Sequence, residues 1–359
     1  MRRMDKGAPA ASLAGMRAFS HPDQLRHTPR FFLQRGQLRP NFEVPERAAS
    51  LLAGLERLGI PAETAALPGR AALEAVHAAD YLDFLEGAVR AWAALPNPGP
   101  EVVANTHATA DALANGARRP EGIIGQAGWY TADTACPIGP GTWEASLAAA
   151  GVALAAAAEA VAGRSAYALC RPPGHHAYRA RAGGHCYLNN AAIAVAALRR
   201  AGAGRVATLD IDSHHGNGTQ GIFWEDGAVL TVSVHGDPAN YYPFFTGYPG
   251  ETGAGAGAGL NRNMPLPFGT ADATWLAAID DGIAAARAFG AEALVISLGF
   301  DASEHEPLGM LKVTEDGFAR AGAAIGAMQL PTAIIQEGGY NVELMGRLLE
   351  RFLTGWGGI

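Results

Sequence analysis

Short apolar runs recur along the chain, and each of them ends in polar or ionisable residues. The runs contain β-branched side chains and do not alternate with polar residues, which indicates strands buried on both faces. Alanine-rich stretches of helical length lie between several of them, at 146–162, 190–201, 272–288 and 315–328. Alternating buried strands and helices predict a parallel α/β sheet. The predicted strands are 167–170, 206–209, 229–234, 294–298 and 332–335.

The segments that follow these strands carry most of the reactive side chains. Ligands of open parallel sheets bind outside the carboxyl ends of the strands. One strand ending in potential catalytic groups would mean little, whereas several such strands indicate one active site. The segments are 171–176, 210–215, 235–237, 299–301 and 336–340, and six of the eleven histidines fall between 175 and 235.

The chain has 359 residues, a length that fits two domains or one large α/β domain. Apolar residues make up 49% and charged residues 17%, which favours a large core and excludes a disordered or coiled-coil protein. The candidate site residues described below extend from 175 to 340, so we expect one domain over 16–359. Residues 1–15 resemble a flexible leader.

Charge and cysteine content narrow the partners and the compartment. The net charge is −7 and no basic run occurs, so we expect no nucleic-acid partner. Three cysteines cannot form a disulfide framework, which favours a reducing, cytoplasmic location. The most apolar stretch, 146–163, is mostly alanine and contains Glu159, so we interpret it as a packed helix and expect no membrane span.

Asp212 and His214 are candidate metal ligands. Residues two apart on an extended segment point the same way, so this pair aims a carboxylate and an imidazole at one point. Asp301, after another predicted strand, could be the third ligand. Three protein ligands leave a position for water, as in a catalytic metal site. Zinc suits such ligands, although ferrous iron or cobalt would also fit. The alternative is that these side chains only cap loops.

His175 and His176 follow a stiff Pro-Pro-Gly turn. Adjacent histidines can act as a general base and an electrostatic partner when each is oriented by a second group. Asp210 and Asn217 are available for this: a carboxylate favours a charged imidazolium, and a neutral amide leaves its histidine able to accept a proton. A capped loop with one buried histidine is the alternative.

Tyr340 follows two glycines and can donate a hydrogen bond to a developing oxyanion, although a packed loop tyrosine is equally consistent with the pattern. Together, the metal, a histidine and this phenol predict amide hydrolysis without a covalent intermediate. In that scheme His176 removes a proton from water, and a histidine then protonates the leaving amine.

Four long motifs follow the predicted strands or the segments between them. They are RPPGHHA at 171–177, GHCYLNN at 184–190, DIDSHHGNGTQ at 210–220 and EGGY at 337–340. With these motifs, in this order, the chain resembles the histone deacetylase superfamily over about residues 17–355. Two further stretches, 140–145 and 234–248, resemble the bacterial acetylpolyamine amidohydrolase branch.

The resemblance implies an arginase–deacetylase fold, a single α/β domain around an eight-stranded parallel sheet flanked by helices. It implies one Zn²⁺ per chain, held by Asp212, His214 and Asp301. By the same resemblance, His176 is the general base and acid, His175 is its partner and Tyr340 polarises the carbonyl.

Further positions are implied by the resemblance alone. Gly184 and His185, with Tyr187 nearby, fall where the family lines its substrate channel, and His185 should make this wall more polar than the usual aromatic residue. The family also binds K⁺ or Na⁺ as a structural ion near the active site. The positions that match the ion site are Asp210, Asp212, His214, Ser233 and Val234.

The chain departs from parts of the family pattern. Asn217 stands where the simplest eukaryotic histone deacetylases carry Asp, whereas Asn is usual in the polyamine-like branch. Polyamine-specific relatives carry glutamates near the channel rim, and the alignment places Ile124 and Ala135 there, which leaves Asp133 as the acidic residue of this stretch. Residues 105–130 form an insertion that serves as a dimer interface in that branch, so a homodimer is expected; a simple surface loop is the alternative.

The predicted function is hydrolysis of small N-acetylated amines of the acetylpolyamine type, releasing acetate and free amine. An acetyl-lysine protein deacetylase or a broader amide hydrolase is the nearest alternative. An arginase-like ureohydrolase would need a two-metal site with more aspartates than this pattern offers. A non-catalytic binding protein would not need every expected catalytic position to be filled.

Overall fold

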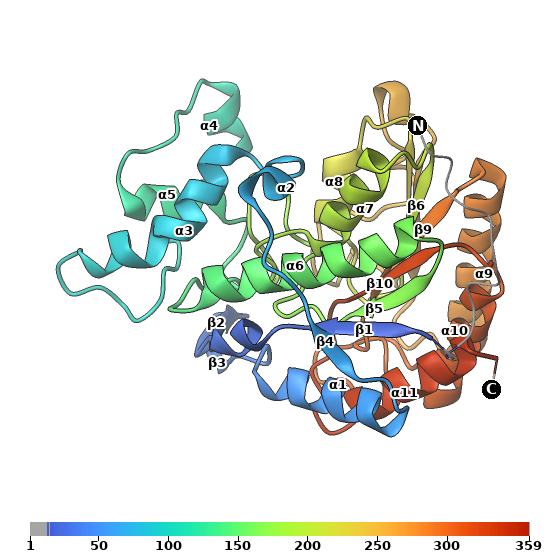
Figure 1. Ribbon diagram of the computed structural model, residues 1–359. Coiled ribbons are helices and arrows are strands. Elements are labelled where there is room, and N and C mark those ends of the chain that lie inside the picture. The colour runs from blue at the N-terminus through green and yellow to red at the C-terminus, as the bar shows by residue number, and fades with distance from the viewer. Residues whose placement is uncertain (1–12, 14, 359) are drawn as a thin grey trace.

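The computed structural model describes residue 13 and residues 15–358, and these form one α/β unit around a parallel sheet (Figure 1). The predicted leader at 1–15 therefore lies almost wholly outside the described residues. The sheet has eight strands in the order β4-β1-β5-β10-β9-β6-β7-β8, and every neighbouring pair is parallel. The predicted fold class and strand number are thus confirmed.

The strand bounds match the apolar runs closely for the five strands predicted from sequence. These five are adjacent in the sheet and form its centre. Three outer strands, β4, β1 and β8, escaped the pattern because they are short or polar: β8, for example, contains two asparagines and a proline. The strands are β1 (Arg17–Ser20), β4 (Ala62–Thr64), β5 (Ser165–Ala168), β6 (Val206–Asp210), β7 (Val229–Gly236), β8 (Asn261–Leu266), β9 (Ala293–Leu298) and β10 (Thr332–Gln336).

Both faces of the sheet are buried. Along β5, Ala166 and Ala168 pack in one core cluster, whereas Tyr167 packs in a second cluster on the other face. Because successive side chains of a strand point to opposite faces, burial on both sides needs apolar residues at every position. This requirement explains why the central strands appear as continuous apolar runs.

Two helical layers cover these faces. One layer holds α1 (Glu46–Arg57), α9 (Asp272–Phe289), α10 (Glu315–Gly326) and α11 (Met345–Trp356), and the other holds α6 (Thr142–Val161) and α7 (Asn190–Arg200). Alanines bring α6 close to its neighbours. Of the described helices, α6 alone is long and apolar enough to cross a membrane, but 67% of its most apolar window is buried, as expected for a packed helix.

The remaining elements extend the rim on the site side. The helices α3, α4 and α5 gather beyond one end of α6 (Figure 1), and residues 109–119 around α4 are exposed throughout. A separate hairpin pairs β2 with β3. Their bounds are β2 (Phe31–Gln34), β3 (Gln37–Pro40), α2 (Arg70–Glu74), α3 (Ala79–Ala93), α4 (Ala110–Ala114), α5 (Ile123–Tyr130) and α8 (Asn217–Phe223).

Candidate active site

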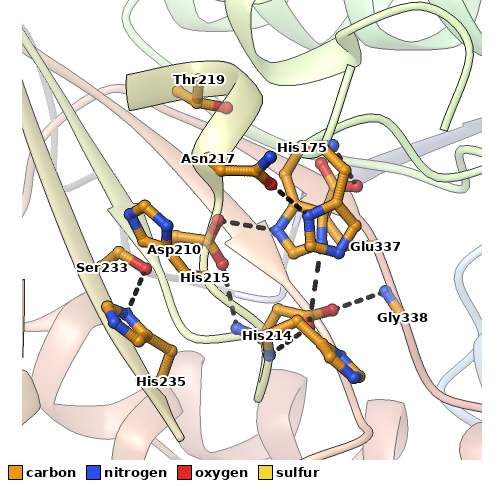
Figure 2. A network of polar contacts seen from close by, with 12 residues as sticks. His175, Asp210, His214, His215, Asn217, Thr219, Ser233, His235, Glu337 and Gly338 are labelled. Atoms are coloured by element: carbon orange, nitrogen blue, oxygen red, sulfur yellow. Dashed lines mark hydrogen bonds and ion pairs between the residues drawn. The ribbon is translucent and has the colours of Figure 1, made fainter. Parts of the chain in front are cut away.

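The five central strands deliver the predicted reactive residues to one place. Since all of them run parallel, their carboxyl ends share one edge of the sheet. The segments after β5, β6, β9 and β10 meet there, with the end of β7 beside them. Figure 2 shows the resulting polar network, in which His175, Asp210 and Glu337 come from three different segments.

Asp212, His214 and Asp301 form a compact cluster of metal-ligating type. One ligand atom from each lies within 4.8 Å of the others. His214 Nδ1 lies 3.2 Å from Asp212 Oδ1 and 3.0 Å from Asp301 Oδ2. Both aspartates are fully buried, a costly arrangement for two carboxylates without a cation. The donor set therefore fits a divalent cation with nitrogen and oxygen ligands.

The backbone around this cluster holds the carboxylates in place. Asp212 Oδ2 accepts a hydrogen bond from Gly338 N at 2.8 Å, and Asp301 Oδ1 accepts one from Ser213 N at 2.8 Å. A Cβ on Gly338 would lie 2.3 Å from Asp301 Oδ2, and one on Gly299 would lie 2.0 Å from Asp212 Oδ2. Glycine at both 299 and 338 therefore leaves room for the Asp212 and Asp301 carboxylates.

His176 is oriented by a neutral amide. Its Nδ1 lies 2.6 Å from Asn217 Oδ1, and the Asn217 amide donates at 3.0 Å to the Tyr178 hydroxyl. Since the Asn217 oxygen can only accept, His176 Nδ1 carries the proton and Nε2 has a free lone pair. Burial, and then the neighbouring His175 and His214, lower the pKa of His176 well below its usual value. This histidine is therefore set up to accept a proton.

His175 is oriented by a carboxylate. Its Nδ1 lies 2.9 Å from Asp210 Oδ2 (Figure 2). Burial works against the charged ring, but Asp210 and then Asp212 outweigh it and raise the pKa of His175 to about 10. The His175 and His176 rings lie 4.0 Å apart between centroids. Two adjacent histidines thus occupy opposite electrostatic environments.

Tyr340 closes the site from the end of β10. The guanidinium carbon of Arg47 lies 4.9 Å from its ring centroid, and the Arg47 side chain donates to the carbonyl of Gly339 at 2.6 Å. On the other side, Glu306 accepts from the backbone N–H groups of Tyr340 at 2.7 Å and of Asn341 at 3.2 Å. Burial raises the pKa of the Tyr340 phenol, so it remains a donor.

A cavity of about 990 Å³ leads to this site. Gly184 and His185 line it, together with His176, His214 and Tyr340. The His185 ring lies 5.7 Å from that of Tyr340 between centroids, and burial lowers the pKa of His185 to about 4. This position therefore gives the wall a neutral imidazole ring.

The position of Tyr187 differs from the prediction. Tyr187 is 1% exposed and packs in the core beneath α3 and α5, outside the residues that line the cavity. Its hydroxyl donates to the carbonyl of Pro137 at 2.5 Å, and its own carbonyl accepts from Tyr81 at 2.6 Å. Gly184 and His185 lie in a turn and both have positive φ (52° and 67°), so the side chains do not alternate regularly along this segment, and Tyr187 supports the channel wall from behind.

The predicted monovalent-cation residues adjoin the metal cluster, and Asp212 and His214 belong to both sets. Asp210 on β6 is directly paired with Ser233 on β7, so the pairing of the two strands brings these backbone positions side by side. Val234 is fully buried, and Ser233 Oγ lies 2.8 Å from His235 Nδ1 (Figure 2). Asp212 and His214 follow on the same loop.

Several residues of the site were not predicted from sequence. Glu337, within a recognised motif, accepts from Gly174 N at 2.6 Å and from His175 N at 3.1 Å, and so fixes the histidine turn. Tyr241 stacks on His214 at 4.4 Å and Tyr242 lies 4.8 Å from His176, both measured between ring centroids. The aromatic content of 234–248 was the available signal for both tyrosines.

Known proteins are similar to this chain over nearly its whole length. Residues 41–356 match the family described as "Histone deacetylase domain". The chain is 46% identical to "Acetylpolyamine amidohydrolase" of Burkholderia pseudomallei (96% of this chain, 99% of that protein) and 42% identical to that of Mycoplana ramosa (95% and 99%). The fold is similar to a crystal structure of acetylpolyamine aminohydrolase from Burkholderia pseudomallei (TM-score 0.92, 46% identity, 96% and 99% covered).

Proposed function

The chain belongs to the histone deacetylase family, and from this premise we propose that it hydrolyses small N-acetylated amines of the acetylpolyamine type. The relatives named above support this reading, which agrees with the prediction from sequence. The observation that carries it is the pair of buried histidines with opposite orienting groups, next to a three-ligand cluster.

Asp212, His214 and Asp301 would hold the metal, which we propose is a single Zn²⁺. When bound there, zinc supplies Lewis-acid chemistry: it polarises a carbonyl group and makes water more acidic. In this proposal, His176 Nε2 accepts the proton of the attacking water, and the Tyr340 hydroxyl donates to the oxyanion. Charged His175 stabilises the negative charge that develops beside it.

The second half of the reaction breaks the C–N bond. His176 returns its proton to the leaving nitrogen, so free amine and acetate are released. Asp210 acts through His175 by keeping its ring charged, and Asn217 acts through His176 by fixing the proton on Nδ1. Gly184 and His185 form the channel wall around the acetamide.

Other parts of the proposal concern the ions, the assembly and the location. We propose that K⁺ or Na⁺ occupies the position formed by Asp210, Asp212, His214, Ser233 and Val234. The proposed compartment is the cytoplasm.

Residues 105–130, with exposed Leu113 and Ile124, are the proposed homodimer interface. Light scattering is expected to give twice the chain mass; a monomer at micromolar concentration would exclude the dimer.

Steady-state assays on a substrate panel test the function. We expect acetylputrescine, acetylcadaverine and acetylspermidine to be hydrolysed with higher kcat/KM than an acetyl-lysine peptide. If only the peptide turns over, the small-amine proposal is wrong and the protein deacetylase alternative holds. Guanidino substrates such as arginine are expected to remain intact.

A further inference from the structure

One carboxylate lies on the wall of the cavity outside the metal cluster. Among the described residues that line the cavity, Asp133 is the only acidic side chain. The basic side chains of the lining are Arg35, Arg179 and Arg181, of which Arg35 and Arg179 are exposed. The lining therefore carries more arginines than carboxylates. Asp133 is the lining side chain whose charge can attract a cation.

Asp133 is held in place by three hydrogen bonds. Its Oδ2 accepts from the Tyr242 hydroxyl at 2.6 Å and from Gly184 N at 3.0 Å, and its Oδ1 accepts from Ala135 N at 2.7 Å. All three partners donate, as suits a carboxylate anion. An anion offers about four acceptor positions, so these three bonds leave about one position unused.

The partners of Asp133 also set its depth in the cavity. The Tyr242 ring lies 4.8 Å from the His176 ring between centroids, nearly perpendicular to it. Gly184 also lies against His176, because a Cβ built on it would lie 2.4 Å from His176 Cδ2. Asp133 is therefore separated from the proposed general base by one tyrosine side chain on one path and by one glycine on the other.

We propose that Asp133 recognises the free ammonium group of a monoacetylated diamine and selects such substrates over neutral acetamides. This inference rests on the proposed function. An extended chain advances about 1.2 Å per bond, so the ammonium of acetylputrescine lies about 6 Å from its amide nitrogen. That length is comparable with the tyrosine side chain that separates Asp133 from His176.

The test compares two substrates of equal length on two variants. N-pentylacetamide carries a methyl group where acetylputrescine carries its ammonium group. Asp133→Asn removes the charge, and Asp280→Asn makes the same charge change at an exposed position of α9, outside the cavity lining. We expect Asp133→Asn to lower kcat/KM for acetylputrescine roughly 10- to 100-fold, mostly through KM, since a hydrogen bond to a charged group is lost.

The neutral substrate separates recognition from structure. N-pentylacetamide should be hydrolysed by Asp133→Asn at about the wild-type rate, and Asp280→Asn should match wild type on both substrates. If both substrates lose kcat/KM equally, Asp133 only supports the loop, and the inference is wrong. It is also wrong if the wild type is active and Asp133→Asn changes neither substrate. A zinc-loaded wild type that hydrolyses neither acetamide overturns the proposed function, and this inference with it.

Discussion

The deep end of the cavity and its mouth are built on different principles. At the deep end, Asp212, Asp301 and both histidines are buried at the ends of central strands, and backbone N–H groups bind the carboxylates. The mouth is formed by loops and a hairpin, with Phe245 89% and Phe268 77% exposed. Rigid strand ends therefore carry the proposed chemistry, while loops from distant parts of the chain shape the opening.

Loss of a metal ligand should have the largest effect at the deep end. Asp301→Asn is expected to lower zinc content and to reduce kcat/KM by roughly three orders of magnitude or more, because several kcal/mol of transition-state stabilisation depend on the metal. Elemental analysis and acetylputrescine turnover measure the two effects. Asp280→Asn serves as the control and should match wild type. Activity within tenfold of wild type in Asp301→Asn would remove Asp301 from the ligand set.

The next effect concerns the proposed general base. His176→Ala is expected to reduce kcat by about 10²- to 10⁴-fold, since proton transfer loses its positioned acceptor. Zinc content and the circular dichroism spectrum should stay at wild-type values, because His176 is outside the ligand cluster. A drop of less than tenfold in kcat, with zinc retained, would assign the proton transfer to another group.

Tyr340→Phe removes only a hydroxyl. We expect kcat to fall by about 10²- to 10³-fold with zinc retained, as for the loss of one oxyanion donor. Arg47 and Glu306 continue to hold this segment of backbone, so thermal unfolding should be unchanged. Unchanged activity would refute the proposed role of the phenol.

A smaller effect is expected for the residue that positions Tyr340. Glu306→Gln keeps one of the two acceptor oxygens, so one of the hydrogen bonds from Tyr340 N and Asn341 N is lost. Loss of one hydrogen bond is worth about 1 kcal/mol, so kcat should fall roughly three- to tenfold. In the Tyr340→Phe background the same change should have little further effect on kcat; a full additional loss would mean that Glu306 acts elsewhere.

The mouth should be the most tolerant region. Phe245→Ala removes an almost fully exposed ring from the cavity rim. We expect kcat for acetylputrescine to stay near wild type and KM to change by less than about threefold, because little apolar area is buried there before substrate binds. A large fall in kcat would contradict the division between a chemical deep end and a permissive mouth.

The same division explains what could be predicted from sequence. A strand buried on both faces must be apolar throughout, so the central strands were visible in the sequence pattern. The polar residues that follow them were visible as well. Asp210, Asp212 and Asp301 could therefore be placed together at the carboxyl ends of the strands. Edge strands such as β8 bury less and therefore carry mixed sequences. The fold family and strand number came from motif resemblance, because strand order depends on long-range packing.

Contacts between loops that are distant in sequence could not be predicted, because no local sequence pattern indicates them. The hydrogen bond from Tyr242 to Asp133 joins residues that are 109 positions apart, and Glu306 reaches the Tyr340 backbone across 34 positions. Tyr187 was expected near the channel, but the turn with positive φ at Gly184 and His185 leaves it buried in the core. Residues 105–130 and the ion positions remain predictions for the experiments above.

Acetate release from acetylputrescine by metal-free and zinc-reconstituted protein tests the central claim most directly. The account predicts no release after chelation. It predicts equal amounts of acetate and putrescine once one zinc per chain is restored, with wild-type kcat recovered. Full activity of the metal-free protein, or no acetate from protein carrying one zinc per chain, would contradict it.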